Sequence, residues 1–527
     1  MFAVAGQQDK ACSRVRRHVR LVSVRLRRGR GTTCRHRHVE SWRRRYPEEN
    51  RNYAVGYDES TAESSSAVES KDTVARALVV GGGPAGLATA IMLAQKGWKV
   101  RVVEKRDAPP PPSDASYTSN PDRSYNLGVS ARGQTVLDRL GVLENVLKFA
   151  SFNYGRQTWD ENGNTKLQLR KAESYQAICI QRDRLTGVLL EAARTYSSIE
   201  IEHNVEVSSI TWNSSGPQVS LGEEEKVFPD LLVGADGFNS KVAKALESEG
   251  VSPIKVKTFE DKNTRVYKTV PLDYDLDKSC DFRRDLNFSV LSQNGAEVTL
   301  EVLPTAEGKG VGVCLYKPGN KAVELAASAE KAKELFVENF PQFSTVIPDS
   351  AFGAFASQRD QRLPVFQVAL NSLVGPKTVC IGDAIHTVKP YFGLGVNSAF
   401  EDVGAFANAL EGVEPGNLAS EDLEKSLDSY SSQHKENCAA LVRMSRSFDG
   451  GFLTFVLPII LDSIFSKIFP KLFGPISIRM LQQHELPFGK ASFIKRRDRA
   501  LQVAILSAVL YAIVRLFRWT IGKLIAS

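Results

Sequence analysis

The 527-residue sequence predicts an α/β fold that starts from a nucleotide-binding strand–helix–strand unit. An apolar run, Ala77–Val80, leads into the glycine-rich segment Gly81–Gly86 and then into the helical run Leu87–Lys96. A second apolar run, Val100–Val103, closes at the acidic residue Glu104. Strands that alternate with a helix in this way form a parallel sheet. Because 42% of the residues are hydrophobic, the chain can bury a large core in two or more structural units.

The glycines of the first turn fit the pattern G-x-G-x-x-G, and each has a separate task. Gly81 permits the tight turn, Gly83 lets the backbone approach a pyrophosphate, and Gly86 lets the helix pack closely on the strand. The pyrophosphate would then lie at the N-terminus of the helix, which favours anions. Glu104 follows Gly86 by 18 residues and is placed to accept hydrogen bonds from ribose hydroxyls. Since its charge disfavours a 2′-phosphate, this Rossmann-type unit predicts FAD or NAD rather than NADP.

A second glycine-rich turn, far downstream in the sequence, distinguishes between FAD and NAD. The β-branched run from Thr378 ends at Gly382-Asp383, and the chain then passes Gly393 and Gly395 into a helix with apolar residues at helical spacing. Its free amides and positive helix end would stabilise negative charge on a reduced flavin ring, and Asp383 would accept a hydrogen bond from the ribityl chain. Two such turns at opposite ends of one cofactor predict FAD.

The order of the motifs resembles a known family. G-x-G-x-x-G, then Gly-Ala-Asp-Gly around Asp236-Gly237, then Gly-Asp-Ala…His…Pro…Gly-x-Gly is similar to the group A flavoprotein monooxygenases with the p-hydroxybenzoate hydroxylase fold. Within that group, Pro390–Asp402 and Arg123–Gly133 look most like the kynurenine 3-monooxygenases. The resemblance covers roughly residues 75–490. Ala243 departs from it, because the group usually has an arginine there.

This resemblance implies a hydroxylase that holds FAD permanently and uses NADPH, or NADH, as a transient co-substrate. A C4a-hydroperoxide of the flavin would hydroxylate a small aromatic substrate with O₂, and the protein would orient the ring and exclude water. No metal and no catalytic residue is implied, and we expect His386 to pack beneath the flavin turn rather than to act as a base. The alternatives are hydroxylation of a lipophilic quinone or isoprenoid precursor and a non-oxygenating FAD oxidoreductase.

The resemblance also implies a set of site residues. Arg156 falls where an arginine would clamp a substrate carboxylate, although the expected partner positions carry Arg170, Gln433 and Ser477. The implied cofactor contacts are Gly81, Gly83, Ala85, Gly86, Glu104, Lys105, Arg106, Gly128, Arg182, Val207, Asp236, Gly237, Asp383, Gly395, Val396 and Asn397.

The chain divides into segments of different composition. We expect a basic, transit-peptide-like leader at 1–46, a disordered linker at 47–72, an FAD-binding domain in two parts at 73–250 and 376–412, an interleaved substrate-side β-sheet segment at 251–375, a C-terminal helical region at 413–490 and a membrane-associated tail helix at 491–527.

The charge distribution excludes nucleic acid as a partner. The leader holds 14 basic and two acidic residues, so the remainder of the chain is net negative although the whole is +8. Seven scattered cysteines indicate neither a disulfide framework nor a zinc site. The uncharged run Ala500–Val514, followed by Arg515, Arg518 and Trp519, predicts a tail anchor or an interfacial helix. With the leader, this predicts an organelle membrane, the mitochondrion ahead of the plastid.

Overall fold

The computed structural model describes residues 74–119, 125–170, 176–261, 263–279, 282–417 and 420–526. The predicted leader and linker, and Arg123, lie outside these described residues.

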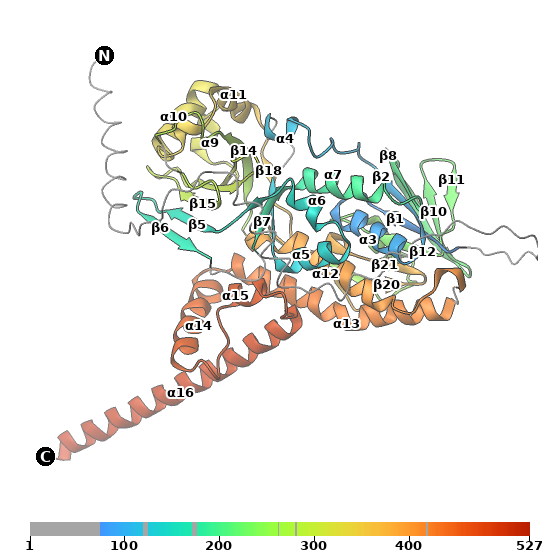
Figure 1. The fold of residues 1–527 in the computed structure, drawn as a ribbon. Coiled ribbons are helices and arrows are strands. Elements are labelled where there is room, and N and C mark those ends of the chain that lie inside the picture. Colours follow the sequence, from blue (N-terminus) through green and yellow to red (C-terminus); the bar gives the residue numbers. More distant parts are fainter. Residues whose placement is uncertain are drawn as a thin grey trace, which may run out of the picture. The chain divides into compact units, whose positions relative to one another are not determined.

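A mainly parallel sheet forms the centre of the cofactor-binding part (Figure 1). Its strand order is β20 (Val374–Gly375), β21 (Thr378–Cys380), β12 (Leu231–Gly234), β1 (Arg76–Val80), β2 (Lys99–Glu104) and β8 (Ile199–His203). Strand β1 pairs in parallel with both β2 and β12, and β12 pairs in parallel with β21, so the predicted strand–helix–strand unit is confirmed. Only the short β20 runs antiparallel among the described strands of this sheet. The carboxyl ends of β1, β12 and β21 therefore meet at one edge, where α/β sheets bind ligands.

Helices cover this sheet because their apolar faces complete its core. The helix α3 (Pro84–Gln95) buries Leu87, Ile91 and Leu93 against the strands, and it starts three residues earlier than predicted, with Pro84 in its first turn. Further helices of this layer are α5 (Ala131–Arg139), α6 (Leu143–Leu147), α7 (Arg182–Ala193) and α12 (Leu394–Ala409). Smaller elements are α4 (Ser116–Ser119), α8 (Lys241–Ser248) and the antiparallel β9 (Val207–Asn213), β10 (Gly216–Leu221) and β11 (Glu225–Val227).

A second, largely antiparallel sheet lies beside the first (Figure 1). Its order is β18 (Gln361–Arg362), β14 (Val266–Leu272), β17 (Gly310–Tyr316), β16 (Thr299–Pro304), β15 (Leu286–Leu291), β5 (Gly155–Trp159) and β6 (Thr165–Leu169). One face packs on α9 (Lys321–Leu325), α10 (Ala329–Asn339) and α11 (Asp349–Ser357) through a core that includes Phe288, Phe336 and Phe343. The sheet thus differs from the predicted segment 251–375, because it takes β5 and β6 from far upstream and because that segment also contains helices. Neither feature is visible in local alternation, since strand pairing is a tertiary property.

Short strands connect the two sheets. The strands β3 (Asn126–Val129), β7 (Ile178–Gln181) and β4 (Ser151–Phe152) pair with one another, as do β13 (Lys255–Thr258), β19 (Gln367–Leu370) and β22 (His386–Thr387). The intervening turns are η3 (Ser344–Val346), η4 (Gly382–Ala384), η5 (Tyr391–Gly393) and η6 (Pro415–Asn417).

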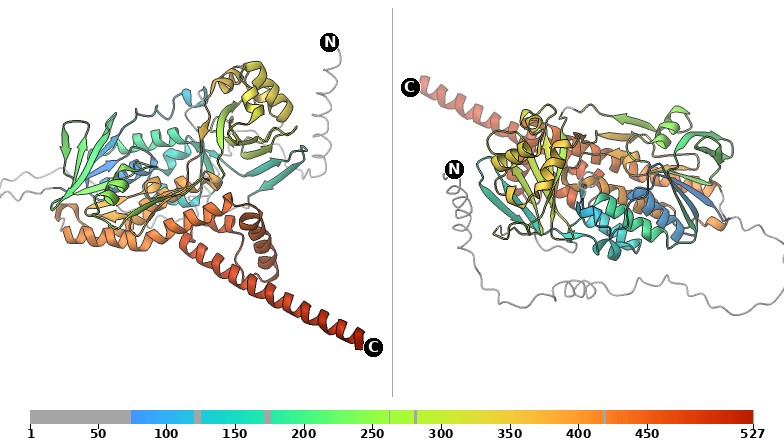
Figure 2. Two further views of the ribbon diagram at one scale, coloured as in Figure 1. Left: turned by 180° about the vertical axis from the view of Figure 1, so that it is seen from behind. Right: turned by 90° about the horizontal axis from the view of Figure 1, so that it is seen from above.

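The C-terminal region is helical, as the sequence predicts. It comprises α13 (Ser420–Arg446), η7 (Ser447–Asp449), the π-helix η8 (Phe452–Val456), α14 (Leu457–Ile468), α15 (Ser477–Gln482) and α16 (Phe488–Ala526). The first part of α16 packs on α13, whereas its distal part projects away from the other described elements in both views of Figure 2. By length and composition, α16 is a helix that could cross a membrane, and only 6% of its apolar window is buried.

Candidate cofactor and substrate site

In the first turn, the fold requires glycine at two positions and leaves free space beside a third. Gly81 has a φ of 111°, and a Cβ there would lie 2.3 Å from the carbonyl oxygen of Ala235. A Cβ on Gly86 would lie 1.9 Å from the carbonyl oxygen of Gly81. In contrast, a Cβ on Gly83 would meet no atom within 4 Å, and Gly83 precedes the first turn of α3. The turn therefore presents the amide end of α3 beside an open position, as a pyrophosphate needs.

Glu104 stabilises this turn through two hydrogen bonds from backbone amides. Its Oε2 accepts a hydrogen bond from the Gly82 amide at 2.8 Å, and its Oε1 accepts one from the Arg106 amide at 3.0 Å. The carboxylate thus lies at the predicted place, at the end of β2, and its position is fixed by backbone donors. Lys105 and Arg106 follow it and have exposed side chains.

The second turn lies directly against the first. Gly382 has a φ of 68°, and a Cβ on it would lie 3.2 Å from the Cβ of Ala85 and 3.4 Å from the Cβ of Ala399. Ala85 is in the first turn of α3, and Ala399 is in α12. The two glycine-rich turns, nearly 300 residues apart in the sequence, are therefore neighbours in space. This juxtaposition is what one cofactor bound by both turns requires.

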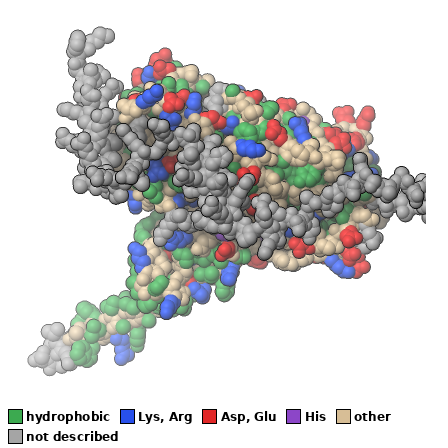
Figure 3. Space-filling model, viewed as in Figure 1, with side chains coloured by type: hydrophobic (Ala, Val, Ile, Leu, Met, Phe, Trp, Pro, Cys, Tyr) green, Lys and Arg blue, Asp and Glu red, His purple; other side chains and the backbone are tan. Residues whose placement is uncertain are grey.

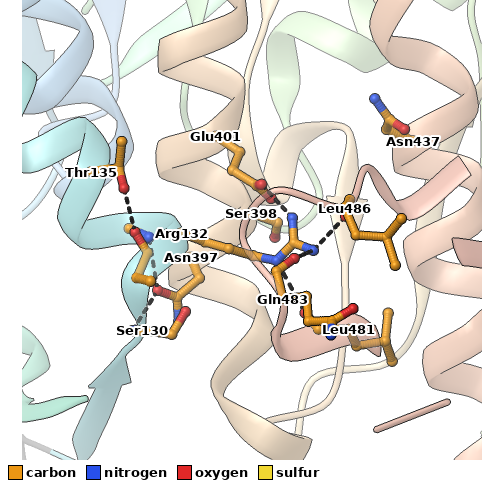
Figure 4. A network of polar contacts seen from close by, with 12 residues as sticks. Ser130, Arg132, Thr135, Asn397, Ser398, Glu401, Asn437, Leu481, Gln483 and Leu486 are labelled. Atoms are coloured by element: carbon orange, nitrogen blue, oxygen red, sulfur yellow. Dashed lines mark hydrogen bonds and ion pairs between the residues drawn. The ribbon is translucent and has the colours of Figure 1, made fainter. Parts of the chain in front are cut away.

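Asn397 joins the second turn to β3. Its Nδ2 donates to the Gly128 carbonyl at 2.8 Å, and its Oδ1 accepts from the Ser130 amide at 2.9 Å and the Gly133 amide at 3.2 Å (Figure 4). Gly393, in the left-handed conformation at a φ of 66°, precedes α12. Gly395 and Val396 lie half-buried in the first turn of that helix. Asn397 thus holds the amide end of α12 in register with Gly128.

Arg182, Asp383 and Tyr125 lie near these turns and interact electrostatically. The Arg182 amide donates to the Tyr125 carbonyl at 3.1 Å, which places the start of α7 on the end of β3. The Asp383 side chain is accessible to solvent, but many protein atoms surround it. Desolvation by these atoms raises the pKa of its carboxyl, whereas His386 and Arg182 lower it. Burial likewise raises the pKa of Tyr125, which senses the charges of both Arg182 and Asp383. Arg182 and Asp383, from distant segments, therefore lie close enough to interact electrostatically.

The remaining predicted contacts lie around the start of α8. The Asp236 Oδ2 accepts from the Lys241 amide at 2.6 Å, so this carboxylate caps α8, while its Oδ1 is buried and has no hydrogen-bond partner among the described residues. Gly237 follows in the left-handed region at a φ of 77°. Val207 is buried, and its carbonyl accepts from Lys241 Nζ at 2.8 Å.

A buried polar cluster lies beneath the second turn. The Asp402 carboxylate contacts His386 Nε2 at 2.7 Å and His434 Nε2 at 2.6 Å, and it also accepts from the Gly382 amide at 2.8 Å. Burial opposes the charge on Asp402, but the two histidines lower its pKa to about 2. Burial lowers the pKa of His434, but Cys438 and Asp402 raise it to about 10. His386 therefore packs beneath the turn, and the cluster fixes the turn's backbone.

The sequence reasoning missed Asp402, His434 and Cys438 as members of this cluster. The available signal was the acidic pair Glu401-Asp402 beside the apolar residue Val403 on the predicted helix. A charged residue on a buried helix face needs a partner. His434 and Cys438 come from α13, and nothing in the sequence relates that helix to the turn.

Arg132 attaches the C-terminal region to the site. Its guanidinium is buried, donates to the carbonyl oxygens of Leu481 at 3.0 Å and Leu486 at 2.6 Å, and also pairs with Glu401 of α12 (Figure 4). It also lies 4.2 Å from the ring centre of Phe488, the first residue of α16. The base of the tail helix is therefore bonded to the two helices that flank the second turn.

Arg156 lies on the second sheet and is paired. Its Nη2 donates to both carboxylate oxygens of Glu301, at 2.9 and 2.8 Å, and Ser289 Oγ donates to the same carboxylate at 2.5 Å. Arg170 follows β6, next to β5. Gln433 is exposed on α13, and Ser477 begins α15.

Together the geometry defines a class of protein. The open position at Gly83 and the neighbouring turn at Gly382 fit a dinucleotide that carries a flavin, so the class is an FAD-binding α/β protein. A family model described as "FAD binding domain" matches residues 74–445, so the chain belongs to that family.

Known proteins are similar to this chain along most of its length. The chain is 25% identical over 446 residues to a kynurenine 3-monooxygenase of Salinispora tropica, covering 81% of this chain and 93% of that protein. Two solved structures share the fold: P. aeruginosa PqsL in complex with 2-aminobenzoylacetate (TM-score 0.55, 20% identity, 71% of this chain and 95% of that one) and CtdE in complex with FAD (TM-score 0.53, 17% identity, 72% and 95%). The chain is an FAD-dependent monooxygenase with the p-hydroxybenzoate hydroxylase-like fold.

Proposed function

We propose that the protein hydroxylates a small aromatic substrate related to kynurenine, with O₂ and a reduced nicotinamide cofactor, NADPH or NADH. The alignment with the Salinispora tropica kynurenine 3-monooxygenase across 81% of this chain is the observation that carries the proposal. The juxtaposed turns at Gly83 and Gly382 supply the cofactor geometry that this reaction needs.

The chain's own residues have distinct tasks in this proposal. The amides at Gly83 would hold the pyrophosphate of FAD, those at the start of α12 would hold its flavin ring, and Asp383 would accept from its ribityl chain. When bound, FAD supplies electron transfer from the nicotinamide and activation of O₂. The polar face of the second sheet would orient the substrate ring, and the apolar core behind it would keep water from that side.

Oxygen incorporation tests the reaction. Purified holoprotein should oxidise NADPH several-fold faster when kynurenine is added, and mass spectrometry should find one atom of ¹⁸O from ¹⁸O₂ in the product. NADPH consumption without labelled product would instead identify a non-oxygenating oxidoreductase.

A second candidate is the same chemistry on a lipophilic ring delivered from a bilayer. The exposed apolar surface of the C-terminal helices favours it: Phe452, Val456, Ile460, Ile464 and Ile468 recur every four residues and are all exposed. A quinone precursor in detergent micelles, assayed beside kynurenine, separates the two candidates by which one stimulates NADPH oxidation.

Membrane association through the tail is a further part of the proposal. Residues 451–527 hold eleven Lys and Arg against three acidic residues, and two of those acids, Asp462 and Asp498, are buried. The distal part of α16 is covered by hydrophobic side chains with basic ones among them (Figure 3). An apolar helix with basic flanks suits an anionic bilayer. We place the protein at an organelle membrane, the mitochondrion ahead of the plastid.

Removal of residues 503–527 tests the tail. This cut keeps Asp498, Lys495 and Gln502, which bond to Gly474 and Asp462, so the C-terminal region should stay folded. The full chain should sediment with vesicles that contain anionic lipid, and the shortened chain should remain in the supernatant. Equal sedimentation of both chains would contradict an anchor in α16.

A further inference from the structure

The Arg156–Glu301 ion pair crosses one face of the second sheet. Arg156 is on β5, Glu301 is on β16, and β15 lies between these strands and contributes Ser289, which is directly opposite Glu301 in the register. The two side chains are 41% and 29% exposed, so the pair is half-buried but within reach of a ligand. Arg156 Nε is buried and has no hydrogen-bond partner among the described residues.

This face of the sheet is turned toward the cofactor-binding part. Residues that alternate with the pair, Trp159, Phe288 and Val302, are buried in the core with α10 and α11, so the pair lies on the opposite face. Asn126 of β3 donates to the Leu303 carbonyl at 3.1 Å, so β3 lies next to the end of β16.

A second contact confirms the direction of the face. Cys179 Sγ of β7 lies 3.8 Å from Asn287 Oδ1, and Asn287 is opposite Arg156 in the register. The pair therefore lies on the face of the sheet that β7 approaches.

The pairing restricts which ligands fit. Burial raises the pKa of the Glu301 carboxyl above its usual range, although Arg156 acts in the opposite direction. The two side chains pair at 2.8 Å, so each compensates the charge of the other. If a ligand with a carboxylate but no ammonium group bound Arg156, its carboxylate would lie beside that of Glu301. The two negative charges would repel each other, because the site is half-buried. A ligand with both a carboxylate and an ammonium group replaces each partner with an equivalent one.

We propose that Arg156 and Glu301 together select a substrate that is a zwitterionic α-amino acid. Arg156 binds the α-carboxylate of this substrate, Glu301 binds its α-ammonium group, and Ser289 orients Glu301. This inference rests on the proposed function, which supplies the aromatic ring. It assigns Glu301 and Ser289 as specificity-determining residues beside Arg156.

Binding of four related ligands to the FAD-loaded protein tests the proposal. The ligands are kynurenine, its des-amino carboxylic acid, its des-carboxy amine and neutral 2-aminoacetophenone, each titrated by calorimetry without NADPH. Kynurenine should bind at least about tenfold more tightly than the des-amino acid, because one hydrogen bond to a charged group is worth about 1.5–3 kcal/mol. Equal affinity for these two ligands, or no binding of kynurenine, would overturn the proposal.

The variant Glu301→Gln makes the test specific. It should abolish the preference for kynurenine over the des-amino acid, because the ammonium loses its partner while the carboxylate no longer meets a like charge. Glu324→Gln, an exposed acid on α9, serves as the matched control and should keep the preference. If Glu301→Gln weakened all four ligands by the same factor, its role would be structural and the proposal would be wrong.

The two proposals fail in distinguishable ways. If the wild-type protein prefers the zwitterion but forms no ¹⁸O-labelled product from it, the proposed reaction is wrong and the selectivity of the pair stands. If labelled product forms equally well from kynurenine and its des-amino acid, the reaction stands and the role of Glu301 is refuted.

Discussion

We propose that the turn around Gly81 and the sheet face around Arg156 belong to the same site, and the two regions differ in how they would bind a ligand. The turn uses backbone amides, and its shape depends on the absence of side chains at Gly81 and Gly86. The sheet face uses charged side chains from strands that are far apart in the sequence, Arg156 and Glu301. Backbone amides suit a cofactor whose pyrophosphate does not vary. Charged side chains on the sheet face allow the preference for a substrate to change through one substitution.

The two regions also differ in how their charges are held. Asp402 beneath the second turn is almost fully buried and has three hydrogen-bonding partners, so it is a permanent part of the fold. The Arg156–Glu301 pair is half-exposed. We therefore expect substitutions beneath the turn to change stability and substitutions on the sheet face to change ligand preference, and the following predictions test this contrast.

The largest effect is expected from Gly81→Ala. The new Cβ would lie 2.3 Å from a backbone oxygen of Ala235, at a φ of 111° that alanine rarely adopts. Both the short contact and the strained φ involve the backbone, so no side-chain movement can relieve them. The variant should be recovered without bound flavin and mostly insoluble, as judged by absorbance at 450 nm and by yield. Recovery of normal yellow protein would contradict the tight approach of β1 and β12.

Asp402→Ala should come next, with a loss of about 3–5 kcal/mol in the free energy of unfolding, because it leaves the buried His386, the largely buried His434 and the Gly382 amide without their partner. Chemical denaturation of the apoprotein measures this loss. Glu324→Gln, which removes an exposed charge, should shift the midpoint hardly at all. A similar small shift for Asp402→Ala would show that the cluster is not a structural support.

Gly83→Ala should separate cofactor binding from folding. No atom lies within 4 Å of the added Cβ, and the φ of −76° suits alanine, so the melting temperature of the apoprotein should stay within about 1 °C of the wild type. The methyl group would occupy the place where a pyrophosphate approaches, so the Kd for FAD should rise about tenfold or more. An unchanged Kd by flavin fluorescence would remove Gly83 from the cofactor site.

The smallest effect concerns pH. His434 has its pKa raised to about 10 from the ordinary 6.5, so its contribution to stability is complete below pH 6.5 and is lost as the pH rises through 10. The melting temperature of His434→Gln should therefore lie a few degrees below that of the wild type at pH 6, and the gap should close by pH 10. Asp402, with a pKa of about 2, adds an opposite loss only as the pH falls from 3.8 through 2. A gap that is constant from pH 6 to pH 10 would contradict the charged state of His434.

Parts of the fold and of the site were predictable because they depend on local chemistry. The strand–turn–helix at Gly81, the acid Glu104 and the turn at Gly382 each carry their signal within a few residues, and the structure places all three together. The membership of β5 in the second sheet was not predictable, because its parallel partner β15 lies over a hundred residues away. Arg156 was found from the resemblance, whereas its partner Glu301 lies in an alternating strand that reads as an ordinary half-polar strand.

The sequence by itself determined the class of the cofactor and the apolar character of the tail, since glycine spacing and a long uncharged run act through the backbone and through composition alone. Only the tertiary structure decided what each charge does. It showed that Asp402 supports the cofactor turn, that Asp236 caps α8 and that Arg156 already has a partner. The physical reason is that the energy of a charge depends on its burial and on the groups within a few ångströms, and both are set by packing between segments that are distant in the chain.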